Sequence, residues 1–466
     1  MPVQKPISVW EHQFLPIDDK IFTKDHFKLL VNYFERQNRK LSYMFETSCR
    51  KGVNGILFKH YVGVITVKDL TIYVLPKADK DAKEKTDEST TTLWQDRLTF
   101  MLSQVYKLNV QTSAPANLQW KHNVLLNIFL KKFLDEVAVL LNRGLIKTYR
   151  KTDGNRTALK GKLLFNKQIA YNCVHQERFY VRYTTYDYNH ILNRIIRQAL
   201  LAIHDITNSS DIKGRATSTL FNFPELDEIA VTPELFSHII FDRKSEDYRA
   251  VIKLAEMILL NYSPDLHHGS NHVWTMMFDM NKLWEEFVFV TLRRRLTDCK
   301  VTAQSRKLLW KSNQNTKSVK ADIIIQKENE TFVLDTKWKM PRIKDVIVPS
   351  DGDLHQMYVY FYKYGGAGKG MVKKVALLYP GDDSEVKGWF VNDSGQEEGC
   401  CDMLFLPCRA SMEQKHSVQE CRDWQKAITS RVIEWLNQQS HIKPSEIPLN
   451  TVAFRDHEQS LPFPCY

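Results

Sequence analysis

Residues 318–340 read SVKADIIIQKENETFVLDTKWKM, two apolar and β-branched runs on either side of a short polar segment. Runs of this kind are typical of a β-hairpin. If the loop is the four residues 327–330, then residue 326 pairs with 331 and, counting outward, 322 pairs with 335. Opposed residues share one sheet face, as do residues two apart on one strand. The pattern therefore predicts that Asp322, Asp335 and Lys337 converge.

Such a group has a recognisable chemistry. Two carboxylates at a strand end repel each other and are costly to bury unless a cation joins them, and Mg²⁺ prefers oxygen ligands. Lys337 beside them can hold an attacking water or offset charge on a phosphate. The group therefore favours metal-assisted phosphodiester hydrolysis. The alternative is an ordinary surface Asp–Lys pair, because D-x-K alone is a common sequence.

The residues around the hairpin predict an α/β domain. MFDMNKLWEEFVFVTLRRRL (277–296) has the 3.6-residue period of a helix, with Asp279 as its N-cap and one apolar face. That face comprises Met280, Leu283, Trp284, Phe287 and Val290. Residues 353–364 also predict a helix, and VKKVALLYP (372–380) predicts a buried strand.

The preceding residues divide by composition and period. Residues 56–77 alternate as half-buried strands do, residues 78–92 are charged and rich in Ser and Thr, and the following segments are helical. We expect a β-rich module over 1–77, a linker or loop over 78–92 and a mainly helical region over 93–262, the three together folding without residues from 275 onward. The predicted helices are 93–108, 123–145, 191–206 and 247–260, with a strand-like run at 179–188.

Composition limits the class of protein. The chain has 466 residues, 43% of them hydrophobic, and a net charge of +11, which excludes wholesale disorder and favours a polyanionic partner. No stretch reaches about 18 apolar residues and the N-terminus lacks an apolar signal core, so we expect a cytoplasmic protein without a membrane partner. The eight cysteines contain no CxxC pair, which favours reduced thiols over a zinc site at residues 400–421.

The order of acidic helix, D-x12-D-x-K hairpin and following helix resembles the PD-(D/E)xK nucleases, especially their RecB-like branch. Ala321 stands where the nominal motif has Pro. The resemblance implies that an acid of the preceding helix joins the metal site, and the Leu-Trp-Glu register selects Glu285. Gln356 and Tyr360, four residues apart on one helix face, would touch a phosphate or base near the ions.

Longer blocks resemble McrC, the nuclease subunit of McrBC-type modification-dependent restriction systems. The blocks cover most of residues 50–380 in family order: VGVITVKDLTIYVLPK, LKGKLLFNKQI, YDYNHILNRIIRQAL, FDMNKLWEEFV, KADIII with FVLDTKWK, and DLHQMYVYFYKYGG with VALLYP. The resemblance implies a multidomain α+β or α/β protein in which residues 1–77 dock on a partner, 263–440 form the PD-(D/E)xK nuclease domain and 441–466 form a tail.

The same resemblance implies a function and partners. It implies a Mg²⁺-dependent DNA endonuclease subunit that docks on and stimulates an McrB-type AAA+ GTPase hexamer and cleaves double-stranded DNA containing methylcytosine, with self-dimerisation through the nuclease domain left open. The chain has no motor site of its own. GGAGKG (365–370) lacks the spacing of a phosphate loop and is better explained as a turn before the strand.

Basic residues near the predicted site suit contacts with the DNA backbone. Those expected to bind DNA are Arg293, Arg294, Arg295 and Lys339, and Arg306, Lys307 and Lys311 lie nearby in sequence. Arginines in a last helical turn also complement the helix dipole. Two other classes stay open: a non-cleaving DNA-binding adaptor that activates the GTPase ring, and a stand-alone nucleic-acid-binding protein, which would have no need of paired acids.

Overall fold

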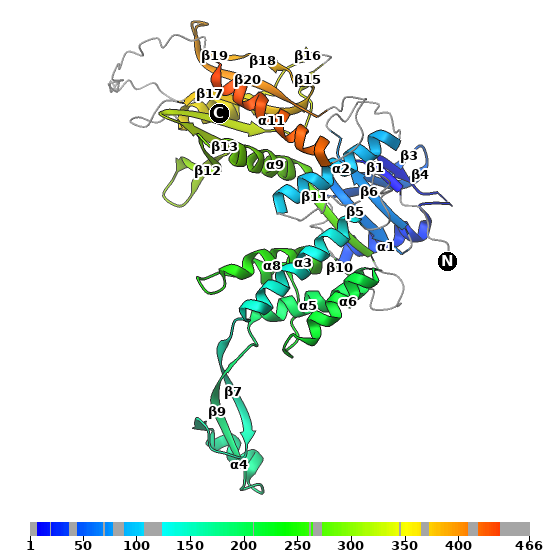
Figure 1. The fold of residues 1–466 in the computed structure, drawn as a ribbon, viewed down its shortest axis with the longest axis vertical. Helices are drawn as coiled ribbons and strands as arrows, with labels where there is room; N and C mark the ends of the chain where they lie inside the picture. The colour runs from blue at the N-terminus through cyan, green and yellow to red at the C-terminus, as the bar shows by residue number, and fades with distance from the viewer. Residues whose placement is uncertain are drawn as a thin grey trace, which may run out of the picture.

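The computed structural model describes residues 7–18, 20–36, 44–68, 70–77, 88–106, 124–207, 209–260, 262–263, 273–343, 346–364, 372–408 and 418–438. The predicted turn at 365–370 and the predicted tail at 441–466 lie outside these residues. Among the helices in them, none is both long and apolar enough to cross a lipid bilayer. Figure 1 shows the C-terminal sheet at one end, the N-terminal sheets beside it, and helices leading down to a projecting arm.

The N-terminal part is built on two sheets and one helix. Strands β4, β5 and β6 form where residues 56–77 predict strands, and β5 and β6 are almost entirely buried rather than half-buried. The elements are β1 (Ile7–Trp10), β2 (Phe14–Pro16), α1 (Lys24–Arg36), β3 (Phe45–Arg50), β4 (Val53–Phe58), β5 (Tyr61–Val67) and β6 (Leu70–Leu75).

A distant strand completes the larger of these sheets. Its order is β1-β6-β5-β11-β10, with β10 at Tyr262–Ser263 and β11 at Val273–Asp279. Strand β11 is antiparallel to β5 along its whole length. Gly63 permits this close pairing, because a Cβ there would lie 2.0 Å from the Met276 carbonyl oxygen. The sheet thus crosses the expected boundary at 262/263, and a fragment of residues 1–262 would lack an inner strand, contrary to our expectation that it folds alone.

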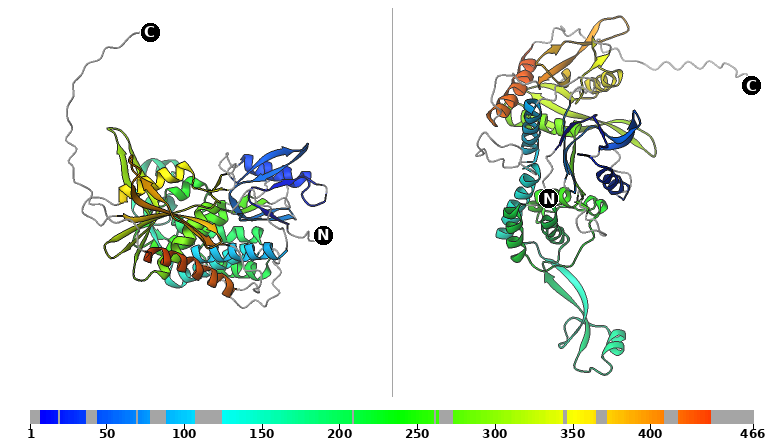
Figure 2. Two further views of the ribbon diagram at one scale, coloured as in Figure 1. Left: turned by 90° about the horizontal axis from the view of Figure 1, so that it is seen from above. Right: turned by 90° about the vertical axis from the view of Figure 1, so that its right-hand side faces the viewer.

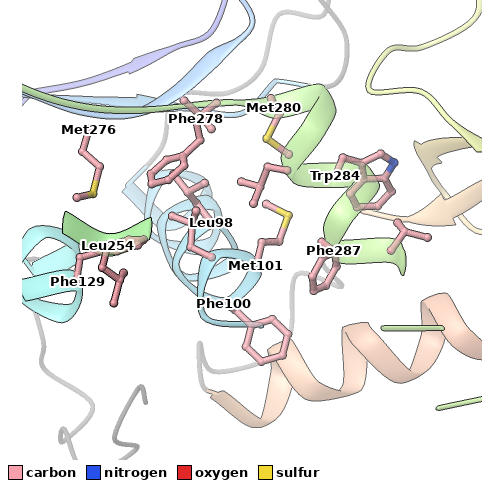
Figure 3. Close-up of a cluster of buried hydrophobic side chains, with 14 of the residues drawn as sticks. Leu98, Phe100, Met101, Phe129, Leu254, Met276, Phe278, Met280, Trp284 and Phe287 are labelled. Carbon is pink, nitrogen blue, oxygen red and sulfur yellow. The ribbon is translucent and has the colours of Figure 1, made fainter. Parts of the chain in front are cut away.

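The helical middle region lies on this sheet, and the predicted linker ends early because α2 begins at Glu88. The predicted helix at 191–206 is confirmed at those bounds, and the others within two to five residues. The helices are α2 (Glu88–Tyr106), α3 (Val124–Arg143), α5 (Ile191–Ile206), α6 (Ser210–Phe221), α7 (Pro233–Ser237), the 3₁₀ turn η2 (Glu246–Tyr248) and α8 (Arg249–Leu260). Figure 3 shows side chains of α2, α3, α8, β11 and α9 packed in one cluster.

An arm interrupts the middle region. Strands β7 (Thr148–Arg156) and β9 (Phe179–Asp187) pair along nine residues, and β8 (Lys162–Leu163) and α4 (Phe165–Asn172) lie between them in sequence. The arm projects away from the rest of the molecule in Figures 1 and 2. Val181 and Tyr183 of the arm are buried, but several of its large apolar side chains are exposed: Phe165 at 70%, Ile169 at 68%, and also Tyr149, Leu159, Tyr171, Val174 and Tyr186.

The C-terminal part is a mixed sheet with helices on both faces. Its order is β12-β13-β14-β17-β20-β18, with β19 also on β20, and β14, β17 and β20 are parallel neighbours. The elements are α9 (Met280–Arg295), β12 (Lys300–Lys311), β13 (Thr316–Lys327), β14 (Glu330–Thr336), β15 (Arg342–Ile343), β16 (Val346–Ile347), α10 (Asp351–Tyr364), β17 (Val372–Gly381), β18 (Glu385–Val386), β19 (Trp389–Val391), β20 (Glu397–Pro407) and α11 (Val418–Asn437).

Alternation along the strands separates the two faces. Ile323 and Ile325 pack with α9 and α11, whereas Ile324 packs with α10. Asp279 caps α9 as predicted, accepting hydrogen bonds from the backbone of Asn281 and Lys282. The buried face of α9 contains Val288 in place of the expected Val290. Cysteines 400, 401, 408 and 421 are buried and free.

Candidate active site

The predicted hairpin has the predicted register. Gln326 pairs with Thr331 and Ile323 with Leu334, so that Asp322 and Asp335 occupy the next position outward. The turn is shorter than expected: Lys327 pairs with Glu330, which leaves a two-residue loop and the same register. Asp335 lies on the sheet face that packs against α10, since it accepts a hydrogen bond from Gln356 of that helix, and Asp322 lies beside it on the neighbouring strand.

Asp335 is the most enclosed acid of the group. Its side chain is 1% exposed, Lys337 Nζ lies 2.6 Å from Oδ2, and Gln356 donates a hydrogen bond of 3.1 Å to Oδ1. Burial, together with the nearby charge of Asp322, raises the pKa of this carboxyl to about 7 despite the opposing charge of Lys337. A buried acid with a raised pKa is the electrostatic state that a bound cation would relieve.

Asp322 is half-buried and held by the other strand. Its Oδ2 accepts hydrogen bonds from Thr336, at 2.9 Å from the backbone nitrogen and 3.1 Å from the hydroxyl. Burial raises the pKa of Asp322 despite these hydrogen bonds and the nearby charges of Lys337 and Lys320. The two bonds to Thr336 fix the orientation of this carboxylate beside Asp335.

Lys337 is surrounded by acids. Its Nζ lies 2.6 Å from Asp335 and 3.6 Å from Asp353, and it donates a hydrogen bond of 2.9 Å to Gln356 Oε1. Burial by itself lowers the pKa of this ammonium, but the charges of Asp335, Asp353 and Asp322 and the hydrogen bond to Asp335 together outweigh burial, and the net pKa is raised. Lys337 is therefore held as a cation, which suits it to stabilise negative charge rather than to accept a proton.

The two residues predicted on one face of α10 are both at the site. The amide nitrogen of Gln356 also donates to the Tyr360 hydroxyl at 2.7 Å, and that hydroxyl donates to the Lys320 carbonyl oxygen. Tyr360 is 2% exposed, and burial raises the pKa of its hydroxyl above the ordinary value. In this arrangement Gln356 links the acid and the lysine, and Tyr360 anchors β13 two residues before Asp322.

Asp353 is a site residue that the sequence pattern did not single out. It lies in the first turn of α10, where Lys339 Nζ approaches it at 2.6 Å and Ser350 Oγ accepts a hydrogen bond from its backbone nitrogen. Burial raises its pKa, but the hydrogen bonds to Lys339 and Ser350 and the charges of Lys337 and Lys339 together outweigh burial, so the net pKa is lowered. Its position as the first acid of a predicted helix was the available signal.

Glu285 approaches the pair from α9. It is half-buried and accepts a hydrogen bond of 2.9 Å from Gln304, which lies on β12 across from Asp322. Burial, followed by the charge of Asp322, raises its pKa. Yet in the part of the chain that the structure describes, no three His, Cys, Asp or Glu side chains form a group that could hold a metal ion. The expected ligand set of Asp322, Asp335 and Glu285 is thus not assembled here as one group.

The donor chemistry still fits Mg²⁺. This ion is commonly bound through one or two carboxylates and keeps several of its waters. Asp322 and Asp335 supply carboxylate oxygens at adjacent positions of neighbouring strands, and burial raises the pKa values of both, a state that a bound cation would relieve.

Of the four residues expected to bind DNA, three lie at the end of α9 and one lies at the site. Arg293, Arg294 and Arg295 are exposed at the end of α9, two to three turns beyond Glu285, and Arg294 donates to Gln104 of α2. Lys339 pairs with Asp353 at the site itself. Of these four, Lys339 is the one that the fold brings to the carboxylates.

Comparisons with known proteins place the chain in a family. A family model described as "McrBC 5-methylcytosine restriction system component" matches residues 56–380. The type IV methyl-directed restriction enzyme EcoKMcrBC of Escherichia coli (strain K12) is 23% identical over 225 residues, 44% of this chain and 64% of that relative, so the match spans just under two thirds of the relative's length.

One solved structure covers nearly the whole chain. It is a refined half-complex from a tetradecameric assembly of Thermococcus gammatolerans McrB AAA+ hexamers with bound McrC, and the match has a TM-score of 0.54 at 19% identity over 91% of this chain and 100% of that chain. At this identity the likeness shows a shared fold.

Proposed function

The chain belongs to the family of McrBC 5-methylcytosine restriction system components, and on that basis we propose that it is the nuclease subunit of such a system. The substrate is double-stranded DNA containing methylcytosine, the reaction is Mg²⁺-dependent phosphodiester hydrolysis, and the sheet of β12, β13, β14, β17 and β20 is a PD-(D/E)xK nuclease fold. The partner is an McrB-type AAA+ GTPase ring, whose GTP hydrolysis the chain stimulates.

One observation carries the proposal. Asp335 is fully buried beside a second acid, Asp322, and both carboxyls have raised pKa values although Lys337 is only 2.6 Å from Asp335. A hairpin needing only structural stability gains nothing from two adjacent acids, because their repulsion and desolvation both oppose folding. Binding a divalent cation removes that cost.

Each side chain then has a task. Bound Mg²⁺ would polarise the phosphoryl oxygen and lower the pKa of an attacking water. Asp322 and Asp335 would hold the ion, Thr336 orients Asp322, and Gln356 orients Asp335. Lys337, kept cationic by its acidic neighbours, would stabilise the charge that develops on the phosphate.

The arm of residues 148–187 is the surface that we assign to the GTPase ring. It projects from the molecule and exposes several large apolar side chains, which on a soluble protein mark an interaction site. The matched solved structure holds McrC bound to McrB hexamers. Docking through residues 1–77 stays a prediction, but β5 and β6 of that module are buried.

The test is cleavage of methylated duplex DNA by the chain with its cognate GTPase, GTP and Mg²⁺. Asp335→Asn should reduce cleavage by about 100-fold or more, because it removes a charged ligand, while GTPase stimulation persists. Asp393→Asn, at an exposed turn, is the matched control and should cleave as wild type does. A wild-type chain that stimulates the GTPase but leaves DNA uncut would establish the non-cleaving adaptor instead.

A further inference from the structure

The strands that carry the candidate site continue beyond the sheet as a two-stranded ribbon. Strand β13 pairs with β14 only from Ile323 to Lys327, whereas it pairs with β12 along Thr316–Gln326. Residues 305–321 therefore form a ribbon that extends from the sheet edge next to Asp322, as Figure 1 shows for the hairpin of β12 and β13. We call residues 305–321 the basic ribbon.

The charged side chains of the basic ribbon are all positive. Between Asp298 and Asp322 the sequence contains no acid, and the basic ribbon carries five cations: Arg306, Lys307, Lys311, Lys317 and Lys320. All but the half-buried Lys320 are exposed, and within the described residues none of the five forms a recorded ion pair with a carboxylate.

Alternation places part of this charge on the face of the candidate site. Lys320 is two residues from Asp322 on β13 and therefore shares its face, and Arg306 is its registered partner on β12. Lys307 and Lys317 lie on the opposite face, since alternate residues point to opposite sides.

The pairing of Arg306 with Lys320 is unfavourable in the protein alone. Like charges directly opposed across two strands have Cβ atoms about 4.5–5.5 Å apart and destabilise the pair. A phosphate between them would turn this repulsion into two favourable contacts.

We propose that the basic ribbon is a DNA-binding element that grips the sugar-phosphate backbone flanking the scissile phosphate, with Arg306 and Lys320 as its principal contacts. This proposal rests on the proposed function for the position of the scissile phosphate. What it predicts is DNA binding by the basic ribbon. Contacts of this kind are independent of base sequence and carry no information about methylation.

The experiment measures binding of the full chain to a fluorescein-labelled, unmodified 20-base-pair duplex by anisotropy, in EDTA so that nothing is cleaved. The double variant Arg306→Gln/Lys320→Gln should bind at least about tenfold more weakly near 100 mM salt. The slope of log affinity against log salt should fall by about 2, one unit for each lost phosphate contact. The matched control is Arg243→Gln/Lys244→Gln, an exposed Arg–Lys pair in the helical region, which should bind as wild type does.

A second variant tests the face. Lys307→Gln/Lys317→Gln removes the same charge from the opposite side of the ribbon and should weaken binding less than the Arg306/Lys320 variant. An Arg306/Lys320 variant with wild-type affinity and salt slope would overturn the proposal, and a larger loss in the Lys307/Lys317 variant would overturn the assigned face. The binding assay contains no metal, so its result does not depend on catalysis. In the separate cleavage assay, an Asp335→Asn variant that cleaves normally would refute the nuclease mechanism and leave the binding result unchanged.

Discussion

Glu11 accepts a 2.6 Å hydrogen bond from the indole nitrogen of Trp338, the residue that follows Lys337. Glu11 is fully buried after β1 and also accepts a hydrogen bond from the backbone of Lys77. The Trp338 ring packs against Trp284 and Trp94, with centroids 5.2 and 6.0 Å away. The N-terminal part of the chain is thus bonded directly to the end of the strand that carries the candidate catalytic residues.

Removing this contact should weaken the whole fold. In Glu11→Ala the indole N–H of Trp338 loses its buried acceptor, which should reduce the free energy of unfolding by about 1–3 kcal/mol. Urea denaturation followed by circular dichroism gives this value. Glu46→Ala, an exposed acid paired with Lys59 in the same region, should change stability by less than about 1 kcal/mol. Equal stability of the two variants would show that the Glu11–Trp338 bond contributes nothing.

Lys337→Ala should separate hydrolysis from metal binding. The ammonium contacts the acids but is not a ligand, so its loss should slow cleavage by about 100-fold while the Mg²⁺ concentration for half-maximal rate changes little. Single-turnover cleavage at a series of Mg²⁺ concentrations measures both quantities. Lys373→Ala, which removes a partly exposed lysine paired with Glu330, serves as the control. Loss of Mg²⁺ saturation in a folded Lys337→Ala protein is the result that contradicts this division of roles.

The pH dependence of stability should reveal Asp335. In the folded, metal-free protein its pKa is raised to about 7 from an ordinary value of 3.8. Between these values the folded state holds a proton that the unfolded chain has released, so this group's contribution to stability falls as the pH rises. Denaturation in EDTA at pH 5 and pH 8 should show a larger loss for wild type than for Asp335→Asn. Identical losses would mean that Asp335 ionises normally.

Magnesium should reverse that loss, because a ligand that binds only the folded state stabilises it. Adding Mg²⁺ at pH 8 should raise the stability of wild type and leave Asp335→Asn unchanged. The apparent Mg²⁺ affinity of wild type should increase with pH up to about 7 and then level off, as the deprotonated carboxylate becomes fully populated. Isothermal titration calorimetry at several pH values measures this directly.

Docking through the arm predicts a defect confined to the partner. Phe165→Ser/Ile169→Ser should raise the concentration of chain needed for half-maximal GTPase stimulation by about tenfold or more, because exposed apolar anchors dominate interface energies. Phe221→Ser/Ile240→Ser changes the same residue types at exposed positions of the helical region and should behave as wild type. If the arm variant stimulates the GTPase at the same concentrations as wild type, the docking surface would instead be residues 1–77.

The sequence was most informative where burial imposes a period. The register of β13 and β14, the Asp279 cap and the helix at 191–206 were predicted because alternation, capping and the 3.6-residue repeat are local signals. Asp322, Asp335 and Lys337 follow from that register alone. Gln356 follows from its place on α10, and the structure adds that it bridges Asp335 and Lys337.

The elements and residues that the sequence did not predict are either exposed or defined by contacts between distant parts of the chain. Strand β12 and the arm strand β7 are largely exposed and polar, so they have no apolar alternation to detect. The sequence of β11 looks like the start of the helix that follows it. Its pairing with β5 joins residues about two hundred positions apart, which no local pattern reveals. Asp353 escaped notice because its importance depends on Lys337 and Lys339, which reach it only in the folded chain.

The late arrival of β11 has a consequence for synthesis of the chain. Val67 ends β5 and Val273 begins β11, so roughly two hundred residues must be translated before this sheet can close. At about 5–20 residues per second the edge of β5 stays unpaired on the ribosome for about 10–40 s. An apolar strand edge exposed for that long invites pairing with another nascent chain. Chaperone capture of this edge, or a slow codon run after residue 279 that allows the sheet to close, would set the yield of active protein.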